Sequence, residues 1–208
     1  MTTSTGITEE GKAALIERHR DINVENIDWW DCVYDDFIAT AKTKGFEIDF
    51  HKSIQFSGFW SQGDGASFTG SVDVPLFIEA YGLEWAYPWI MKLLESGGTV
   101  DASVERTSHR YSHENTCRAT VSAHDDFFYL IDTNGDETRE AVLAEWDKLM
   151  MSDIDQLEKD MESARIDLCR ELYRSLEAEY EHLTSDEAVW DSIVANELDN
   201  EPTEEDDQ

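Results

Sequence analysis

The 208-residue chain carries 47 acidic and 16 basic residues, which gives a formal net charge of −31. Polyanions are bound by cationic side chains, so this charge argues against direct binding of free DNA or RNA and of anionic lipid. The 40% hydrophobic content, with seven Trp and nine Phe, excludes a wholly disordered chain.

The cysteines and the most apolar stretch indicate a cytoplasmic protein without a membrane span. Cys32, Cys117 and Cys169 lie far apart and form no CxxC pair, which is typical of reduced thiols in the cytoplasm. No leader segment is visible at the start, and residues 75–94 are interrupted by charges and by Pro88. We therefore expect neither a signal peptide nor a transmembrane helix.

The first predicted elements are two helices. Residues 8–20 form a short helix that Thr8 caps, with acids in the first turn. A second helix, capped by Asn26 or Asp28, ends before Gly45. Its apolar stripe recurs every four residues, at Trp29, Val33, Phe37 and Ala41.

Two antiparallel hairpins are predicted next, because apolar residues alternate along both arms of each. The first joins residues 48–56 to residues 66–74 through a glycine-rich loop, and the second joins residues 100–104 to residues 117–121. Between the hairpins, residues 75–95 are predicted as one helix that ends at two glycines. Its inner stripe is Ile78, Trp85, Trp89 and Leu93. Residues 125–135 are ambiguous, and 127–131 are compatible with a short strand.

From about residue 137 the pattern is helical. One helix is lined by Leu143, Trp146 and Met150, and a longer amphipathic run covers residues 157–183. The face opposite its apolar stripe carries Glu158, Asp160, Glu162, Glu171, Glu177 and Glu181. A last helix, capped by Ser185 or Asp186, reaches about Glu197. Residues 125–208 hold 28 acids and 6 bases, most of the negative excess.

These elements predict an α+β fold: two antiparallel hairpins form a small sheet packed by several helices, with a long acidic C-terminal helical segment. We expect residues 1–23 to be an N-terminal extension with a short helix. Residues 24–198 form a single α+β domain whose helical half starts at about residue 137. Residues 199–208 are expected to be a disordered acidic tail.

The two hairpin connections have the composition of a binding site, with glycines, polar groups and aromatic rings interleaved. Glycines let a partner approach the backbone, and loops held by a sheet often carry binding groups. The candidate binding residues are Ser57, Trp60, Ser61, Gln62, Asp64, His109, Tyr111 and His113. The alternative interpretation is a structural glycine-rich hairpin in which Asp64 bonds its own turn.

We expect no catalytic residue, metal ion or cofactor. On an extended strand His109 and His113 would stand roughly 13 Å apart, from about 3.3 Å per residue, which is too far for both to bind one ion. The segment 132–143 imitates a calcium loop but has Glu137 and Leu143 where glycine and glutamate are needed. No nucleophile motif and no phosphate-binding glycine motif is present.

Four segments, Ile27–Asp31, FSGFWSQGDGA at Phe56–Ala66, Thr107–His113 and Leu176–Glu187, resemble a family of phage and mobile-element proteins. Its members usually carry the label "antitoxin of toxin-antitoxin stability system". The segments occur in the same order, from about residue 24 to about residue 198. The resemblance implies a phage or mobile-element origin, and a phage context favours a small acidic protein that blocks a host enzyme or defence complex.

Two functions remain open on the sequence. The first is a non-enzymatic accessory protein that binds and neutralises a protein partner, either as an antitoxin or as an inhibitor. It would use its acidic helical half or its hairpin loops, and its carboxylates could mimic phosphates towards a basic nucleic-acid-binding surface. The alternative is a ligand-binding or catalytic domain whose pocket is formed by the FSGFWSQGDGA loop and the face of His109, Tyr111 and His113.

Overall fold

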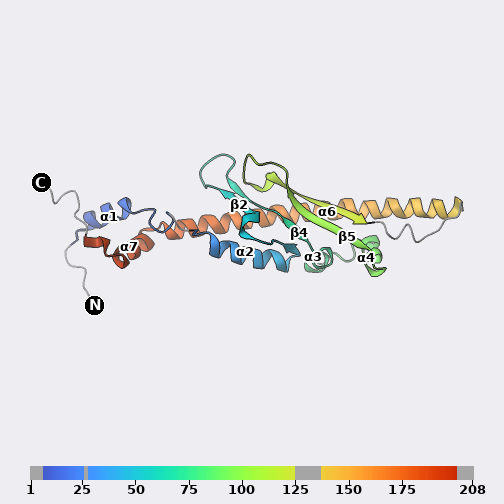
Figure 1. Ribbon diagram of the computed structural model, residues 1–208, viewed down its shortest axis with the longest axis horizontal. Coiled ribbons are helices and arrows are strands. Elements are labelled where there is room, and N and C mark those ends of the chain that lie inside the picture. The colour runs from blue at the N-terminus through green and yellow to red at the C-terminus, as the bar shows by residue number, and fades with distance from the viewer. Residues whose placement is uncertain (1–6, 26–27, 125–136, 201–208) are drawn as a thin grey trace. The chain divides into compact units, whose positions relative to one another are not determined.

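The computed structural model describes residues 7–25, 28–124 and 137–200, and it confirms the α+β class (Figure 1). The helices are α1 (Glu9–Arg18), α2 (Asp31–Thr43), α3 (Val74–Tyr81), α4 (Pro88–Glu95), α6 (Glu137–Leu183) and α7 (Asp186–Ala195). The strands are β1 (Phe46–Glu47), β2 (Ile54–Ser57), β3 (Gly65–Phe68), β4 (Gly70–Val72), β5 (Thr99–Arg106) and β6 (Cys117–His124). Short 3₁₀ helices are η1 (His51–Ser53), η2 (Glu114–Thr116) and η3 (Leu198–Asn200).

The chain divides into two compact units, residues 1–33 with 174–208, and residues 34–173. We call them unit 1 and unit 2. The domain boundaries predicted from the sequence stay a prediction. The strand considered at 127–131 and residues 201–208 of the expected tail lie outside the described residues, whereas Asp199 and Asn200 belong to η3.

Unit 1 contains α1, α7 and the C-terminal end of α6. Both predicted caps are confirmed: Thr8 Oγ1 accepts the Gly11 N–H at 3.0 Å, and Ser185 Oγ accepts the Ala188 N–H at 3.3 Å. Each cap satisfies a backbone donor that the first helical turn leaves unpaired. The small core between the two short helices consists of Leu15, Ile16, Val189 and Ile193.

Unit 2 contains both predicted hairpins, but the first hairpin is divided between two sheets. β4 pairs with β1, which lies just before the predicted arm, in a four-stranded sheet in the order β1-β4-β5-β6. The tip of the hairpin, β2 with β3, forms a separate two-stranded ribbon. The helix η1 lies between β1 and β2 and breaks the alternation there. Phe50 is therefore 59% exposed, although the predicted alternation placed it on the buried face of a strand.

The single helix predicted over residues 75–95 is wrong. Gly82 adopts a left-handed conformation (φ 62°) that ends α3, and Pro88 starts α4, where its missing N–H is not needed. The chain between them turns away, so Trp85 is 81% exposed instead of lining the predicted inner stripe. Ile78 and Leu93 of that stripe are buried, as predicted.

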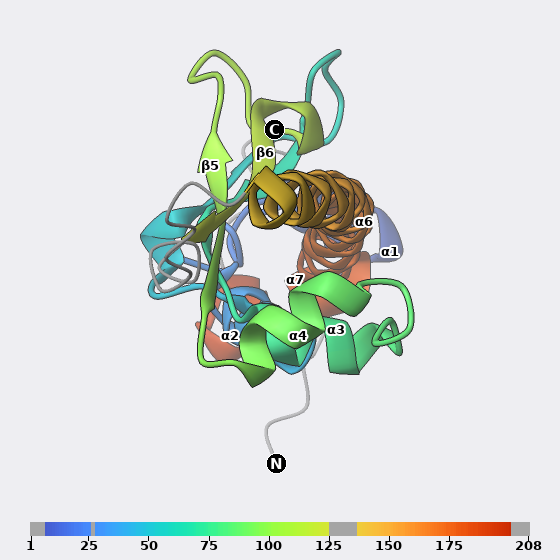
Figure 2. The same cartoon turned by 90° about the vertical axis from the view of Figure 1, so that its right-hand side faces the viewer.

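The core of unit 2 lies between α6, the sheet and helices α2, α3 and α4 (Figures 1 and 2). The two helical runs predicted from residue 137 join into the single helix α6. Within unit 2 its buried stripe confirms the prediction at Leu157, Met161, Ala164, Leu168 and Leu172. Opposite it, Phe68 meets Phe37 and Phe46 edge to face, with ring centroids 5.4 and 5.8 Å apart.

Candidate functional site

The two hairpin loops project from the same side of unit 2 (Figure 1) and touch each other at two glycines. A Cβ atom at Gly65 would lie 2.5 Å from His113 Cβ, and a Cβ atom at Gly63 would lie 3.2 Å from the Tyr111 ring. Only a residue without a side chain allows the first approach. We call residues 58–64 together with residues 107–113 the paired-loop surface.

The ribbon β2–β3 presents a polar face to the second hairpin. Residues opposite each other in an antiparallel pair share a face, so Gln55 lies beside Ser67 and Ser57 lies beside Gly65. Thr116 Oγ1 is 3.5 Å from Ser67 Oγ, and both residues are buried. Ser57 Oγ is buried on this face without a hydrogen-bond partner in the part of the chain that the structure describes.

Arg106 ties the second loop to strand β2, a role that the sequence did not indicate. Its Nη1 donates to Gln55 Oε1 at 2.5 Å, its Nε donates to the Ser108 carbonyl at 2.8 Å, and its Nη2 donates to the Tyr111 carbonyl at 3.1 Å. One guanidinium thus fixes the second loop and ties it to β2. The only signal in the sequence was its position: Arg106 is a basic residue at the end of a segment of alternating apolar and polar residues, in a very acidic chain.

In the first loop, Asp64 acts as a structural residue. Its Oδ2 accepts the backbone N–H groups of Trp60 at 3.0 Å and Ser61 at 2.6 Å, which is the turn interaction that the alternative interpretation expected. The Trp60 side chain is 78% exposed, and Ser61 and Gln62 are also exposed. The loop therefore holds its backbone through Asp64 and presents the other three side chains to solvent.

Below Trp60 lies an aromatic base. Phe59 is 5.8 Å from Trp60, 5.9 Å from Phe56 and 5.6 Å from Tyr173 of α6, measured between ring centroids. The Tyr173 hydroxyl donates to the Gly58 carbonyl at 3.3 Å. Tyr173 is a supporting residue that the sequence could not reveal, because it lies 115 positions from Gly58.

The second loop carries exposed His109 and Arg110 and half-exposed Tyr111. The Arg110 guanidinium lies 5.3 Å from the centroid of the Tyr111 ring, and Tyr111 stacks on His113 at 6.0 Å. His113 Nδ1 accepts the Asn115 N–H at 3.1 Å, so the neutral imidazole carries its proton on Nε2. The structure places Tyr111 and His113 against Gly63 and Gly65 of the first hairpin. Backbone N–H groups of the hairpins themselves engage Asp64 Oδ2 and His113 Nδ1.

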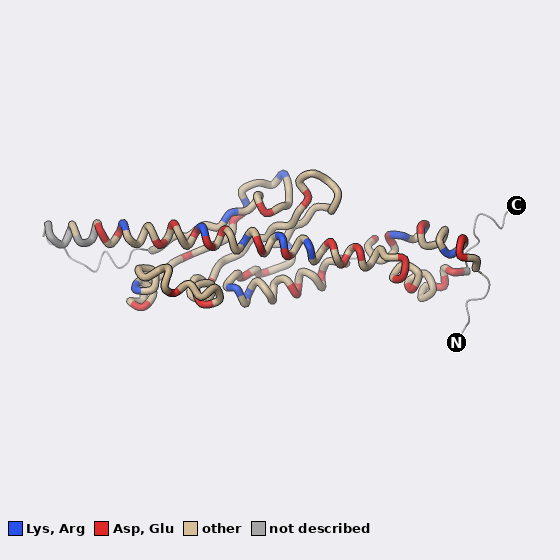
Figure 3. Tube along the Cα trace, turned by 180° about the vertical axis from the view of Figure 1, so that it is seen from behind, with Lys and Arg blue, Asp and Glu red and all other residues tan. Residues whose placement is uncertain are grey.

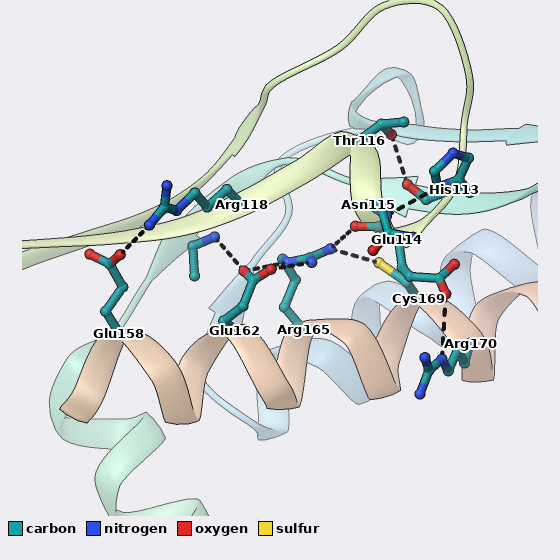
Figure 4. Close-up of polar contacts among 11 residues, drawn as sticks. His113, Glu114, Asn115, Thr116, Arg118, Glu158, Glu162, Arg165, Cys169 and Arg170 are labelled. Atoms are coloured by element: carbon teal, nitrogen blue, oxygen red, sulfur yellow. Dashed lines mark hydrogen bonds and ion pairs between the residues drawn. The ribbon is translucent and has the colours of Figure 1, made fainter. Parts of the chain in front are cut away.

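A buried ion pair anchors the end of the second loop to α6 (Figure 4). The Arg165 side chain is fully buried, and its Nε and Nη2 donate to the Glu162 carboxylate at 2.9 and 2.7 Å. Its Nη1 donates to the Glu114 carbonyl of η2 at 2.7 Å, and Glu162 also accepts the Ala119 N–H of edge strand β6 at 2.9 Å. Burial disfavours the charged form, but the hydrogen bonds from Arg165 and Ala119 hold the pKa of Glu162 below its ordinary value.

The predicted acidic face of α6 is in large part engaged with other groups of unit 2. Glu158 pairs with Arg118 at 3.2 Å, and Glu171 pairs with Lys44 at 3.2 Å. Asp160 accepts the hydroxyl of buried Tyr87. Figure 3 shows Lys and Arg interleaved with Asp and Glu along α6. This stretch of the helix is not an open array of carboxylates.

Other candidate chemistry is sparse. Among the described residues, no group of three or more His, Cys, Asp or Glu is arranged to hold a metal ion. In the same ranges no helix is both long and apolar enough to cross a membrane. Cys117 and Cys169 are buried free thiols, and burial raises the pKa of Cys169 to about 12. An open depression of about 600 Å³ contains none of the predicted site residues and is lined by Asp35, Ile38, Asp49, Phe50, His51 and Lys52.

Comparisons with the curated proteins and with the solved structures gave no match. A family model described as "Domain of unknown function (DUF8835)" matches residues 29–186. The matched range includes all of unit 2 and therefore both loops of the paired-loop surface. Because the match covers most of the chain, the protein belongs to the DUF8835 family.

Proposed function

We propose that this protein is a non-enzymatic binding protein that engages a protein partner through the paired-loop surface. The observation that carries the proposal is the Trp60 side chain, 78% exposed, above a fixed aromatic base. Trp, Tyr and Arg contribute most to the binding energy of protein interfaces. Trp60, Tyr111 and Arg110 supply one of each type on adjacent loops.

The loops are ordered before a partner arrives. Asp64 fixes the first loop, Arg106 fixes the second, and Gly65 allows the two to meet. A surface that is already ordered loses less conformational entropy on binding, so a larger share of the contact energy appears as affinity.

The arrangement supports protein binding over the alternative of a small-molecule or catalytic pocket. Such a pocket would need a concave site with a few convergent polar groups. Asp64 accepts two backbone N–H groups and His113 caps η2 through Nδ1. The exposed side chains that remain are mostly large and suited to an interface.

On the stretch of α6 that belongs to unit 2, the paired carboxylates favour blocking of the partner's surface over phosphate mimicry. Mimicry needs unpaired carboxylates, and Glu158, Glu162 and Glu171 are each paired with a cation. An antitoxin-like or inhibitory role in a phage or mobile element rests on the resemblance of the four segments. Two of these segments, Phe56–Ala66 and Thr107–His113, contain the paired loops.

The test is capture of the partner from extracts of the cells that encode the protein, followed by affinity measurement with the purified partner. Trp60→Ala keeps the backbone N–H that Asp64 accepts, so the loop stays folded. We expect Trp60→Ala and Arg110→Ala to raise Kd by roughly fivefold or more. Phe50→Ala, at another exposed aromatic residue, is the control and should leave Kd unchanged. Equal affinity of all variants would contradict the proposal.

A further inference from the structure

Three tryptophans lie on α4, on the connection that precedes it and on α6. Trp85 in that connection is 81% exposed, and Trp146 of α6 is 37% exposed. The ring of Trp89, near the start of α4, is 5.2 Å from the ring of Trp146. We call Trp85, Trp89 and Trp146 the tryptophan corner.

The corner is built on fixed elements. Asp153 of α6 is 9% exposed and accepts the N–H groups of Trp89 at 2.8 Å and Ile90 at 3.3 Å. It therefore caps the N-terminus of α4 from a neighbouring helix. Tyr87 is fully buried, and its hydroxyl donates a hydrogen bond to Asp160, about two turns farther along α6 than Asp153. The start of α4 at Trp89 is thus fixed to α6, while Trp85 and Trp146 keep apolar area in water.

The surroundings of the corner favour a cation. Exposed Glu84 precedes Trp85, and exposed Glu145 and Asp147 flank Trp146. The protein already places one cation on this aromatic surface, because Lys92 Nζ lies 4.1 Å from the centroid of the Trp89 ring. Indole faces attract ammonium and guanidinium groups, and neighbouring carboxylates strengthen that attraction.

We propose that the tryptophan corner is a docking surface for a cationic amphipathic segment of a partner protein. An apolar side chain of that segment packs on Trp85, and its Lys or Arg side chains pair with Glu84, Glu145 and Asp147. The occupant follows from charge complementarity. A second copy of this chain, with a net charge of −31, is repelled, as are nucleic acids and anionic lipid. This surface uses elements other than the paired loops and goes beyond the proposed function.

The experiment measures binding of a dye-labelled helical peptide of Lys and Leu by fluorescence anisotropy, with the Glu and Leu analogue for comparison. Any acidic protein attracts a cationic peptide weakly. The decisive variants are therefore substitutions that leave the net charge of the protein unchanged. We expect Trp85→Ala and Trp146→Ala to weaken binding of the Lys peptide by roughly fivefold or more. Phe50→Ala should leave binding unchanged. The Glu peptide should not bind.

Two further measurements distinguish binding at the tryptophan corner from attraction by the total charge and from self-association of the protein. Glu145→Gln should weaken peptide binding more than Asp191→Asn, which removes the same charge from an exposed position on α7 in unit 1. Thermal unfolding verifies that each variant is folded. Unchanged peptide binding in folded Trp85→Ala and Trp146→Ala would overturn the proposal. So would a dimer, seen by light scattering, that Trp85→Ala dissociates, because the occupant would then be a second copy.

Discussion

Arg165 keeps its charge inside the core because each of its nitrogens has a partner there. Glu162 accepts two of its hydrogen bonds and the Glu114 carbonyl accepts a third. Removing one partner of a buried ion pair leaves an uncompensated charge, whose burial is strongly unfavourable. A single guanidinium therefore links the stability of α6 to the position of η2 and of the second loop.

At the residue scale, Glu162→Ala should lower the free energy of unfolding by about 3–5 kcal/mol, because it leaves Arg165 buried without its carboxylate. Glu158→Ala is the matched control one helical turn away. It releases Arg118, whose side chain is 66% exposed, so the expected loss is at most about 1 kcal/mol. Urea unfolding measures both values. Losses of equal size would show that the Arg165 pair is no more important than a surface pair.

The same carboxylate predicts a pH dependence. The pKa of Glu162 is lower in the folded protein than in the unfolded chain, so its contribution to stability is complete above the ordinary glutamate pKa of about 4.3. The contribution is lost as the pH falls through the folded-state pKa. The difference in unfolding free energy between the wild type and Glu162→Gln should therefore be constant near neutrality and shrink below about pH 4. A difference that stays constant down to pH 3 contradicts this assignment.

At the element scale, contact between the hairpins depends on Gly65. A methyl group there would lie 2.5 Å from His113 Cβ and 2.8 Å from His113 Cα, so Gly65→Ala should separate the loops and lower stability by about 1–3 kcal/mol. Partner affinity per folded molecule should fall as well. Gly82→Ala is the control, because its φ of 62° makes alanine unfavourable although nothing lies within 4 Å. It should lower stability by about 1 kcal/mol and leave affinity unchanged. Equal affinity of both variants would show that loop contact is unnecessary.

Most elements could be predicted because their signals are local. Alternation predicts the arms of β5 and β6, and Thr8 and Ser185 mark helix starts. Gly82 and Pro88 also marked the break between α3 and α4. The prediction missed this break because the apolar periodicity continues across both residues. The support of the site was not local: Arg106 reaches Gln55 across 51 positions. Sequence patterns reveal which loops carry unusual side chains, but they do not reveal which distant residues hold those loops in place.

At the scale of the whole molecule, the charge of −31 controls which partners can approach. Its long-range field is repulsive towards phosphates, although pairing with cations engages several acids of α6. The purified protein should therefore not shift duplex DNA in a gel at physiological salt. Submicromolar binding that weakens steeply as salt rises would contradict this expectation, because that behaviour is characteristic of cationic contacts with phosphates.

The most direct test of the central claim is hydrogen–deuterium exchange of the protein, alone and bound to its captured partner. Our account predicts that binding slows exchange at the backbone amides of residues 58–64 and 107–113 together, since the two loops form one surface. Amides of α6 at residues 157–171 should change little. Protection confined to α6, with both loops exchanging as in the free protein, would contradict the assignment of the paired-loop surface as the binding site.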